Sequence, residues 1–216
     1  MKKTILAAAA LMAAGFSANV LAQAQNFEGF AVTAATGYQS HQAKGSSFST
    51  YITSADIGSN GGTPVILSGE YTWAMSDKYT LGLGYETNTN NPTESTVTFK
   101  TTGSPGSGTS KLSGLTNLYV KPGMVLNKDA LVYAKLGYVS GKQTFVGSDG
   151  VAGDTNFNAY SIGIGYLQNL SKNLFAFGEI NSSMGLGKDA TLPLSTITYK
   201  LKVDGTNALV GIGYRF

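Results

Sequence analysis

Residues 207–216 read NALVGIGYRF, and this stretch decides the fold. Larger apolar residues alternate in it with small or charged ones at period two, which is the pattern of a β-strand with two unlike faces. One face carries Ala208, Val210, Ile212, Tyr214 and Phe216, and the other carries Leu209, Gly211, Gly213 and Arg215. Such a strand could belong to a soluble sandwich or to a barrel, so the remaining sequence has to discriminate between them.

Seven earlier segments show the same alternation, at about 27–40, 64–75, 79–88, 115–126, 130–140, 156–167 and 174–182. Short turns at 76–78, 127–129 and 169–173 alternate with four long connections rich in Gly, Ser, Thr and Asn, at 41–63, 89–114, 141–155 and 183–206. This alternation of short turns and long connections predicts eight antiparallel strands in up-and-down order, with the long connections as external loops. Extended patches at 96–100 and 196–203 would prolong two hairpins, and ten strands are the alternative.

Charge separates the two faces of these segments. The apolar faces hold no charged residue, whereas charged residues in the same segments fall on the opposite faces. In 174–182 the phase follows from Glu179, because turning its carboxylate into hydrocarbon would cost a few kcal/mol. Leu174, Ala176 and Ile180 then lie on the apolar face. Charged residues make up only 12% of the chain, against about 25% in ordinary globular domains, which also favours a lipid environment.

Aromatic residues gather near the ends of the apolar faces, as in the girdles of membrane barrels. An even strand count places both termini on the periplasmic side, with one aromatic belt at each membrane interface. The predicted girdle residues are Phe30, Tyr38, Trp73, Tyr79, Tyr85, Tyr138, Tyr160, Tyr166 and Tyr214. The predicted fold class is therefore all-β, a transmembrane antiparallel up-and-down β-barrel.

The first residues have the pattern of an export leader. A basic start at 1–3 is followed by an apolar run rich in Ala and Leu up to Phe16. Small residues then offer a cleavage site after Ala24 or after Ala22. The apolar run is shorter than the ~20 residues that a membrane-spanning helix needs, so a retained anchor is the weaker alternative. We predict a signal peptide at 1–24 and one barrel domain at 25–216.

Residues 209–216, LVGIGYRF, resemble the C-terminal assembly signal of outer-membrane barrels, with Tyr214 and Phe216 as its aromatic residues. With the leader and the hairpin lengths, the chain resembles the small eight-stranded family that includes the OmpA transmembrane domain and OmpX, within the porin superfamily. The resemblance implies a Gram-negative bacterial outer membrane, insertion by the barrel assembly machinery, and contact with outer-membrane lipid and lipopolysaccharide.

The charges that face inward predict a polar lumen. Several of them lie five or six residues from their own periplasmic turn, so antiparallel pairing brings them to similar heights. Eight strands leave an interior only wide enough for side chains to fill. We therefore predict a charge-neutralising network in the lumen, similar to the lumen of the OmpA family, made of Glu70, Glu86, Lys121, Lys135 and Glu179.

Several kinds of chemistry find no support in the sequence. The chain has no Cys and a single His, so thiolate catalysis and most metal sites are excluded, and we expect no cofactor. Without the leader, thirteen basic residues face twelve acidic ones, which is no nucleic-acid footprint. The Gly-rich segment 103–111 lacks the lysine of a phosphate loop, because Thr109 follows Gly108. Asp149 and Asp154 offer too few ligands for calcium.

The predicted function is that of a non-enzymatic integral membrane protein, whose plugged barrel displays loops for surface interaction, adhesion or envelope integrity. The extracellular partner of the loops is unknown. A narrow porin-like channel, or a conduit for small solutes including apolar ones, is the alternative. A lipid-modifying enzyme comes third, because Ser40 and His41 are adjacent and point to opposite faces of a strand, where they cannot readily act as nucleophile and base.

Overall fold

The computed structural model describes residues 24–46, 52–90, 95–101, 106–148, 150, 152–191 and 198–216. The predicted leader up to residue 23, the cleavage site after Ala22, residues 103–105 of the Gly-rich segment and Asp149 lie outside these residues. The elements in chain order are η1 (Ala24–Phe27), β1 (Gly29–Ser46), β2 (Ile52–Ile57), β3 (Ser59–Gly62), β4 (Val65–Ala74), β5 (Tyr79–Asn88), β6 (Ser95–Thr101), β7 (Gly106–Asn127), β8 (Ala130–Gly147), β9 (Ala152–Asn169), β10 (Leu174–Leu186), β11 (Lys188–Thr191) and β12 (Thr198–Arg215).

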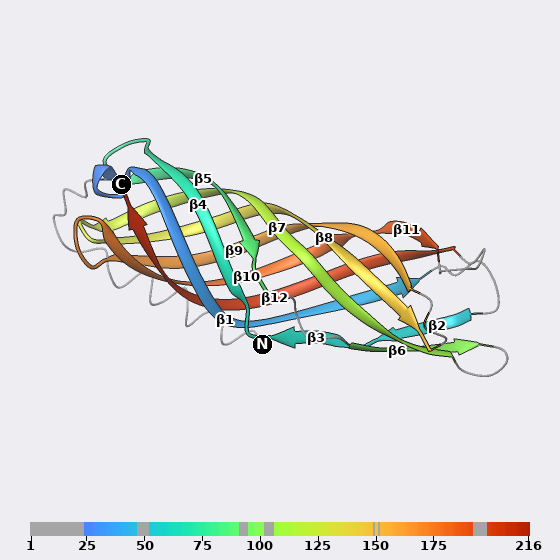
Figure 1. The fold of residues 1–216 in the computed structure, drawn as a ribbon. Helices are drawn as coiled ribbons and strands as arrows, with labels where there is room; N and C mark the ends of the chain where they lie inside the picture. The colour runs from blue at the N-terminus through green and yellow to red at the C-terminus, as the bar shows by residue number, and fades with distance from the viewer. Residues whose placement is uncertain are drawn as a thin grey trace, which may run out of the picture.

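Within the described residues, eight strands close into a barrel in which every neighbouring pair is antiparallel (Figure 1). The ring runs β1, β4, β5, β7, β8, β9, β10 and β12, and β12 pairs again with β1 from Ala31↔Arg215 to Ser46↔Lys200. Closure satisfies backbone groups that would otherwise face lipid. The predicted eight-stranded antiparallel barrel is therefore confirmed.

The four remaining strands lengthen the barrel at one end. β2 joins β1 to β6, and β6 joins β7, so a second path around the sheet passes through β2 and β6 instead of β4 and β5. We call this end the distal end and the opposite end, which holds Phe216 and the short turns, the proximal end (Figure 1). The predicted long connections are too long, because β1, β8 and β10 continue into them and β7, β9 and β12 begin within them.

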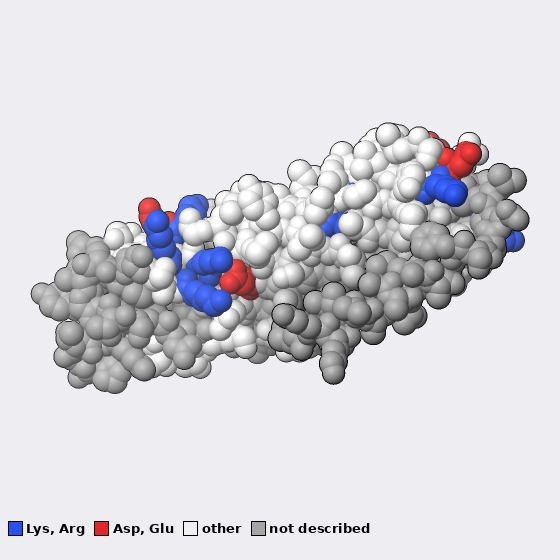
Figure 2. Space-filling view, turned by 180° about the vertical axis from the view of Figure 1, so that it is seen from behind, with Lys and Arg blue, Asp and Glu red and all other residues white. Residues whose placement is uncertain are grey.

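Alternation along each strand separates two surfaces. Large apolar side chains on the outer face are exposed in the isolated chain, among them Val210, Ile164 and Ile180. On β10, Glu179 is buried, whereas Leu174 and Ile180 on the opposite face are exposed, as the predicted phase of this strand requires. Figure 2 shows Lys, Arg, Asp and Glu gathered toward the two ends of the barrel, with a long middle stretch almost free of them. This middle stretch is the apolar band expected of a membrane barrel.

The polarity of the two faces reverses along continuous strands. On β12, Ala208 and Val210 face outward in the apolar band, whereas Lys200 and Lys202 face outward distally. Inside the distal part, a tightly packed apolar cluster fills the barrel, and we call it the distal core. It comprises Ala43, Val97, Leu112, Leu115, Phe157, Ala190, Tyr199, Leu201 and Val203. The distal part thus has the polarity of a water-soluble protein, with apolar residues inside and charges outside.

A bulge in β7 contributes to the distal core. The register between β7 and β8 shifts between Ser113 and Thr116, and Gly114 adopts a φ of +60°, in the left-handed region that glycine tolerates. The extra residue changes the phase of the strand. As a result Leu112 and Leu115, three positions apart, are both buried in the distal core.

The first described residues fill the opening of the barrel at its proximal end. The short helix η1 places Phe27 inside the barrel, where the side chain is fully buried. It packs in a second apolar cluster, the proximal core, made of Ala24, Phe27, Ala31, Val125, Leu131, Tyr133, Leu167 and Phe175. No helix among the described residues is long and apolar enough to cross a membrane.

Candidate functional site

The lumen between the proximal and distal cores holds the ionisable residues that the sequence singled out. Lys135 Nζ lies 2.5 Å from Glu86 Oε2 and 2.9 Å from Glu179 Oε1, so one ammonium group bridges two carboxylates. Lys121 Nζ lies 2.5 Å from Glu70 Oε1. The structure thus brings all five predicted lumen residues into ion pairs, in two groups.

Two tyrosines connect these groups, and the sequence did not predict this role for them. Tyr119 donates a hydrogen bond to Glu70 Oε2 at 3.0 Å, and its ring lies 4.4 Å from Lys135 Nζ. In the same way Tyr133 donates to Glu179 Oε2 at 2.9 Å, and its ring lies 4.8 Å from the Nζ of Lys121. Each tyrosine therefore bonds the acid of one group and contacts the base of the other through a cation–π interaction.

Glycines make room for these inward rings. Gly84 lies directly across from Tyr119 and Gly165 from Tyr133, and a Cβ on either glycine would collide with the ring. Phe175 over Gly213 repeats the arrangement nearer the proximal end. These three glycines, which in the sequence only marked a small-residue face, are places where an aromatic ring lies flat across the neighbouring strand.

Arg215 points into the lumen at the proximal mouth, away from the other charges. Its Nη1 donates to the carbonyl oxygen of Asn26 at 2.9 Å and to Asn169 Oδ1 at 3.2 Å. The guanidinium carbon lies 4.9 Å from the ring of Phe175 and 5.7 Å from that of Phe27. With Arg215 added to the two lysines and three glutamates above, the described lumen charges balance.

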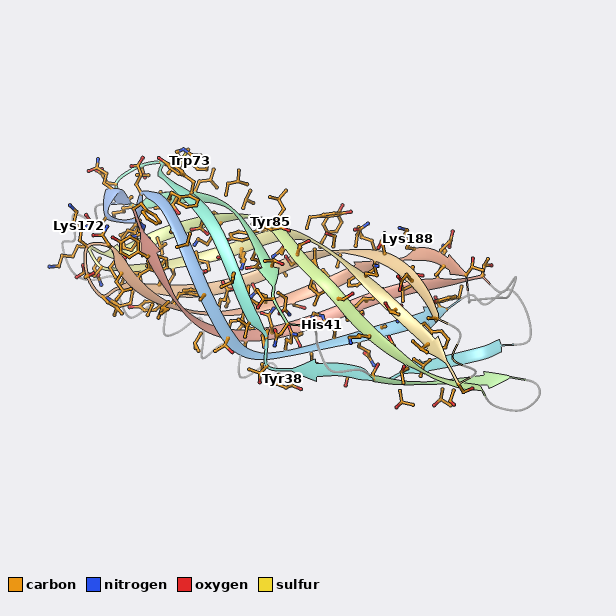
Figure 3. All side chains as sticks on the ribbon, viewed as in Figure 1. Tyr38, His41, Trp73, Tyr85, Lys172 and Lys188 are labelled. Carbon is orange, nitrogen blue, oxygen red and sulfur yellow. The ribbon has the colours of Figure 1, made fainter. Side chains whose placement is uncertain are left out.

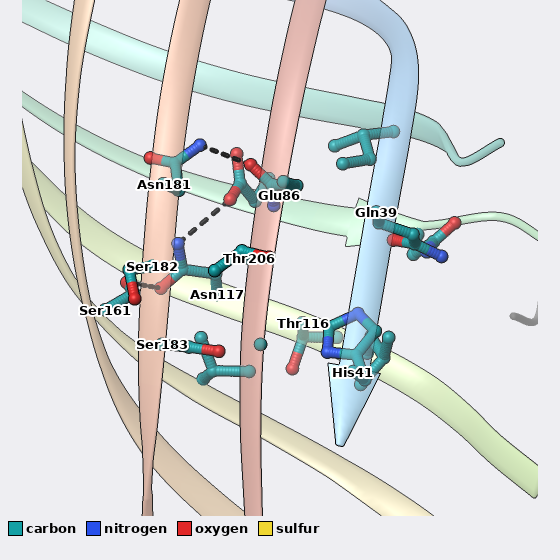
Figure 4. Close-up of a pocket in the computed structure, with 16 residues that line it drawn as sticks. Gln39, His41, Glu86, Thr116, Asn117, Ser161, Asn181, Ser182, Ser183 and Thr206 are labelled. Carbon is teal, nitrogen blue, oxygen red and sulfur yellow. Dashed lines mark hydrogen bonds between the residues drawn. The ribbon is translucent and has the colours of Figure 1, made fainter. Parts of the chain in front are cut away.

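A polar layer separates the ion pairs from the distal core. Asn117 donates to Glu86 Oε1 at 2.9 Å, and Ser161 donates to Asn117 Oδ1 at 3.2 Å. Asn181 donates to Glu179 Oε1 at 2.9 Å and to Asn207 Oδ1 at 2.8 Å. Two of these bonds give the carboxylates of Glu86 and Glu179 an amide donor, and several bonds of the layer are drawn in Figure 4. The layer therefore completes the partners of the buried acids on their distal side.

This layer borders a cavity of about 60 Å³, which we call the amide chamber. Figure 4 shows the imidazole of His41 on the side of the chamber opposite Ser161 and Ser183. Its Nε2 is buried and has no hydrogen-bond partner within the described structure. His41 lies three residues beyond Tyr38, outside the apolar band, and burial lowers the pKa of its imidazole to about 4. The imidazole is thus neutral at neutral pH.

The predicted girdle residues all lie on the outer surface. Near the proximal end these are Phe30, Trp73, Tyr79, Tyr166 and Tyr214, and farther along the barrel Tyr38, Tyr85, Tyr138 and Tyr160. Figure 3 shows Trp73 near the proximal end and Tyr38 and Tyr85 nearer the middle. Ring contacts join Tyr214 to Phe216 at 5.0 Å and Tyr138 to Tyr160 at 5.9 Å between centroids.

Two other side chains considered for chemistry, Asp154 and Ser40, lie on the outer face of their strands. Asp154 accepts hydrogen bonds from Thr144 at 2.7 Å and from Lys142 at 3.1 Å on the distal surface. Ser40 is adjacent to His41 on β1 but on the opposite face, because alternate residues of the strand point to opposite sides. Among the described residues, no group of three or more His, Cys, Asp or Glu side chains could hold a metal ion.

Comparison with known proteins identifies the fold. No protein-family model and no curated protein sequence matches the chain. Among solved structures it is similar to the outer membrane protein OprG from Pseudomonas aeruginosa, with a TM-score of 0.53, 14% identity, and coverage of 92% of this chain and 99% of that chain. It is also similar to the outer membrane protease OmpT from Escherichia coli, with a TM-score of 0.51, 10% identity, and coverage of 87% and 97%.

These likenesses and the closed ring define the class of protein: the chain has the fold of a small outer-membrane β-barrel. At this identity the likeness extends to the fold alone. One of the two similar proteins is a protease, so proteins with different activities share this fold. The function has to be argued from the lumen and the distal end.

Proposed function

We propose that the chain is a non-enzymatic integral protein of the bacterial outer membrane, of the OmpA and OmpX kind, with a plugged lumen. The proximal end faces the periplasm, and the distal end displays a rigid surface for interaction, adhesion or envelope integrity. The position of Tyr214 and Phe216 supports this orientation, because the assembly signal and the short turns share the proximal end. Outer-membrane lipid, lipopolysaccharide and the barrel assembly machinery are the proposed partners.

The filling of the lumen is the observation that carries this proposal. Three layers follow one another along the barrel: the proximal core, the ion-pair network and the distal core. Leu131 in the first layer, Lys135 in the second and Leu112 in the third are all at most 4% exposed. Apolar side chains packed across the narrow barrel at two levels support a lumen that is closed to hydrated ions.

Planar-bilayer recording tests this proposal. We expect the purified barrel to insert without producing stable conductance steps, because an ion would have to displace two apolar cores and a paired network. The folded state of the sample is checked by the difference in gel migration before and after boiling. Stable steps of uniform size in most insertions would contradict a plugged lumen and would support a channel.

A narrow channel or a conduit for small solutes is the second candidate. The amide chamber favours it, since it is a cavity within the lumen. Both cores would have to rearrange for a solute to pass, and this is why we place it second.

An enzymatic role is the third candidate, and its test is the mass of lipid A. We expect lipid A from cells with and without the protein to have the same mass, and the His41→Ala variant to make no difference. The physical reason is that Ser40 and His41 lie on opposite faces of β1. A lipid A species that depends on the protein and disappears with His41→Ala would establish catalysis.

A further inference from the structure

The short helix η1 is bonded to each of the three turns at the proximal end. The Ala24 N–H donates to the carbonyl oxygen of Asp77, between β4 and β5, at 3.1 Å. Asn26 Nδ2 donates to the carbonyl oxygen of Lys128, between β7 and β8, at 3.0 Å. The carbonyl oxygen of Asn26 accepts a bond from Asn169 Nδ2, at the end of β9, at 3.5 Å. Four residues therefore join turns that lie far apart in the sequence.

The same helix is anchored from inside the barrel. The Phe27 side chain is 0% exposed and packs in the proximal core. Arg215 on the last strand donates to the carbonyl oxygen of Asn26 at 2.9 Å, and its guanidinium carbon lies 5.7 Å from the Phe27 ring. Figure 1 shows this first described turn, drawn in blue, beside the C-terminal end of β12. We call residues 24–27 the stopper, because they fill the proximal mouth.

Ala24 is a buried member of the stopper, with 1% exposure and a place in the proximal core. The bond between Ala24 and Gln25 is one of the two bonds at which the sequence allows the leader to be cut. A chain cut there would lose the Ala24 methyl group and the hydrogen bond to Asp77. It would also put the charged amino group of Gln25 where a buried apolar residue now packs, and a charge loses hydration there. The mature chain would then lack a complete stopper.

A cut after Ala22 keeps the stopper complete. Val20 and Ala22 give this bond the spacing of residues that a signal peptidase site requires. A mature chain that begins at Gln23 retains Ala24, and the new charged amino group is separated from the buried alanine by one residue. The contacts of Ala24 therefore discriminate between two sites that the sequence leaves open.

We propose that signal peptidase cuts the chain after Ala22, and that the new N-terminal residues of the mature protein form the stopper of the proximal mouth. The step is hydrolysis of the Ala22–Gln23 peptide bond by water, which leaves a carboxylate on Ala22 and an amino group on Gln23. The proposal rests on the proposed outer-membrane location, because removal of the leader requires export.

The mass of the N-terminal peptide tests the position of the cut. The protein is purified from the envelope of cells that express the full chain, and we expect its first residue to be Gln23. A mature chain that begins at Gln25 would overturn the proposal and leave the proposed function untouched. A retained leader would also overturn it, and in addition would contradict the export on which the proposed function depends.

Two matched substitutions distinguish the sites by the rate of leader removal, followed by pulse–chase labelling. Ala24→Gln places a large residue just before the bond to Gln25 but leaves Val20 and Ala22 unchanged, so the leader should be removed at the normal rate. Ala22→Gln places the same residue just before the proposed cut and should slow removal about ten-fold. Accumulation of the precursor in Ala24→Gln, or normal removal in Ala22→Gln, would contradict a cut after Ala22.

Hydrogen exchange at the Ala24 amide tests whether the stopper is seated in the mouth. In Phe27→Ala the exchange should be about ten-fold faster, because the buried ring no longer holds η1 in place. The control Phe30→Ala removes the same side chain from the outer face, where it is 47% exposed, and should leave the rate unchanged. Gel migration before and after boiling verifies that each variant is folded. Equal exchange rates in the two variants would overturn the stopper.

Discussion

The Lys135→Met variant should lose about 3–5 kcal/mol of unfolding free energy, because the substitution leaves the buried carboxylate of Glu179 and the half-buried carboxylate of Glu86 without their shared base. Lys135 is 4% exposed and Glu179 is 7% exposed, so neither can turn to solvent without disturbing the lumen. Glu86 and Glu179 would then face each other as like charges. Breaking a buried pair costs more than the pair contributes in the intact protein, since the remaining charge stays buried.

Urea unfolding in lipid vesicles measures this loss, with the fluorescence of Trp73, the single tryptophan, as the signal. The matched control is Lys128→Met, whose side chain is 79% exposed beside Asp129 and should change stability by less than about 1 kcal/mol. Adding Glu86→Gln and Glu179→Gln to Lys135→Met should restore more than half of the loss. A loss below about 1 kcal/mol in Lys135→Met would show that the network is hydrated and not buried.

The Gly84→Val variant should lose about 3 kcal/mol, through crowding and through the hydrogen bond that it breaks. A Cβ on Gly84 would lie 2.5 Å from Tyr119 Cζ, so the ring has to leave its place across the strand. Tyr119 would then lose its bond to Glu70 and its contact with Lys135. The Cβ of the introduced valine would therefore remove the link that Tyr119 makes between the two ion-pair groups.

The matched control is Gly178→Val on the lipid-facing side, where a Cβ would meet only the carbonyl oxygen of Leu209 at 3.8 Å. It should change stability by less than about 1 kcal/mol. A double variant, Gly84→Val with Tyr119→Phe, tests the mechanism, because removing the hydroxyl should cost little once the ring is displaced. If Gly84→Val and Gly178→Val lose the same amount, the effect comes from strand propensity and not from the ring.

Alternation allowed much of the barrel to be predicted, because lipid on one side makes every outward charge costly. The cost of placing Glu179 in lipid was enough to predict which face of β10 points outward. The same reasoning placed Lys121 and Lys135 inside the barrel. Alternation gives the face of a residue but not its contacts. Tyr119 and Tyr133 fall on the same strand faces as Lys121 and Lys135, two residues away, yet their spacing does not predict that each bonds an acid from a distant strand.

The distal strands were predicted only in part: the patch at 96–100 lies in β6, and the described residues 198–203 of the second patch lie in β12. The other distal extensions were missed for a different physical reason. The prediction recognised a strand by apolar residues on its outer face, and this criterion fails where water replaces lipid. On β1 the outward residues change from Tyr38 to Ser40, Gln42 and Lys44, while the backbone pairing with β12 continues unbroken. Phe27 was similarly taken as the first residue of a strand, whereas it ends η1 and fills the mouth.

The reversal of polarity along β12 also sets how deeply the molecule sits in its bilayer. A shift by two residues in one direction would draw Asp204 and Thr206 toward hydrocarbon, and a shift in the other would lift Ala208 and Val210 into water. Between Thr206 and Thr198 the strand rises roughly 26 Å along its own axis, or on the order of 20 Å above the membrane after tilt. In the proposed orientation the distal barrel is a rigid extension of fixed height, and a partner that bound its tip would be held at a set distance from the cell surface.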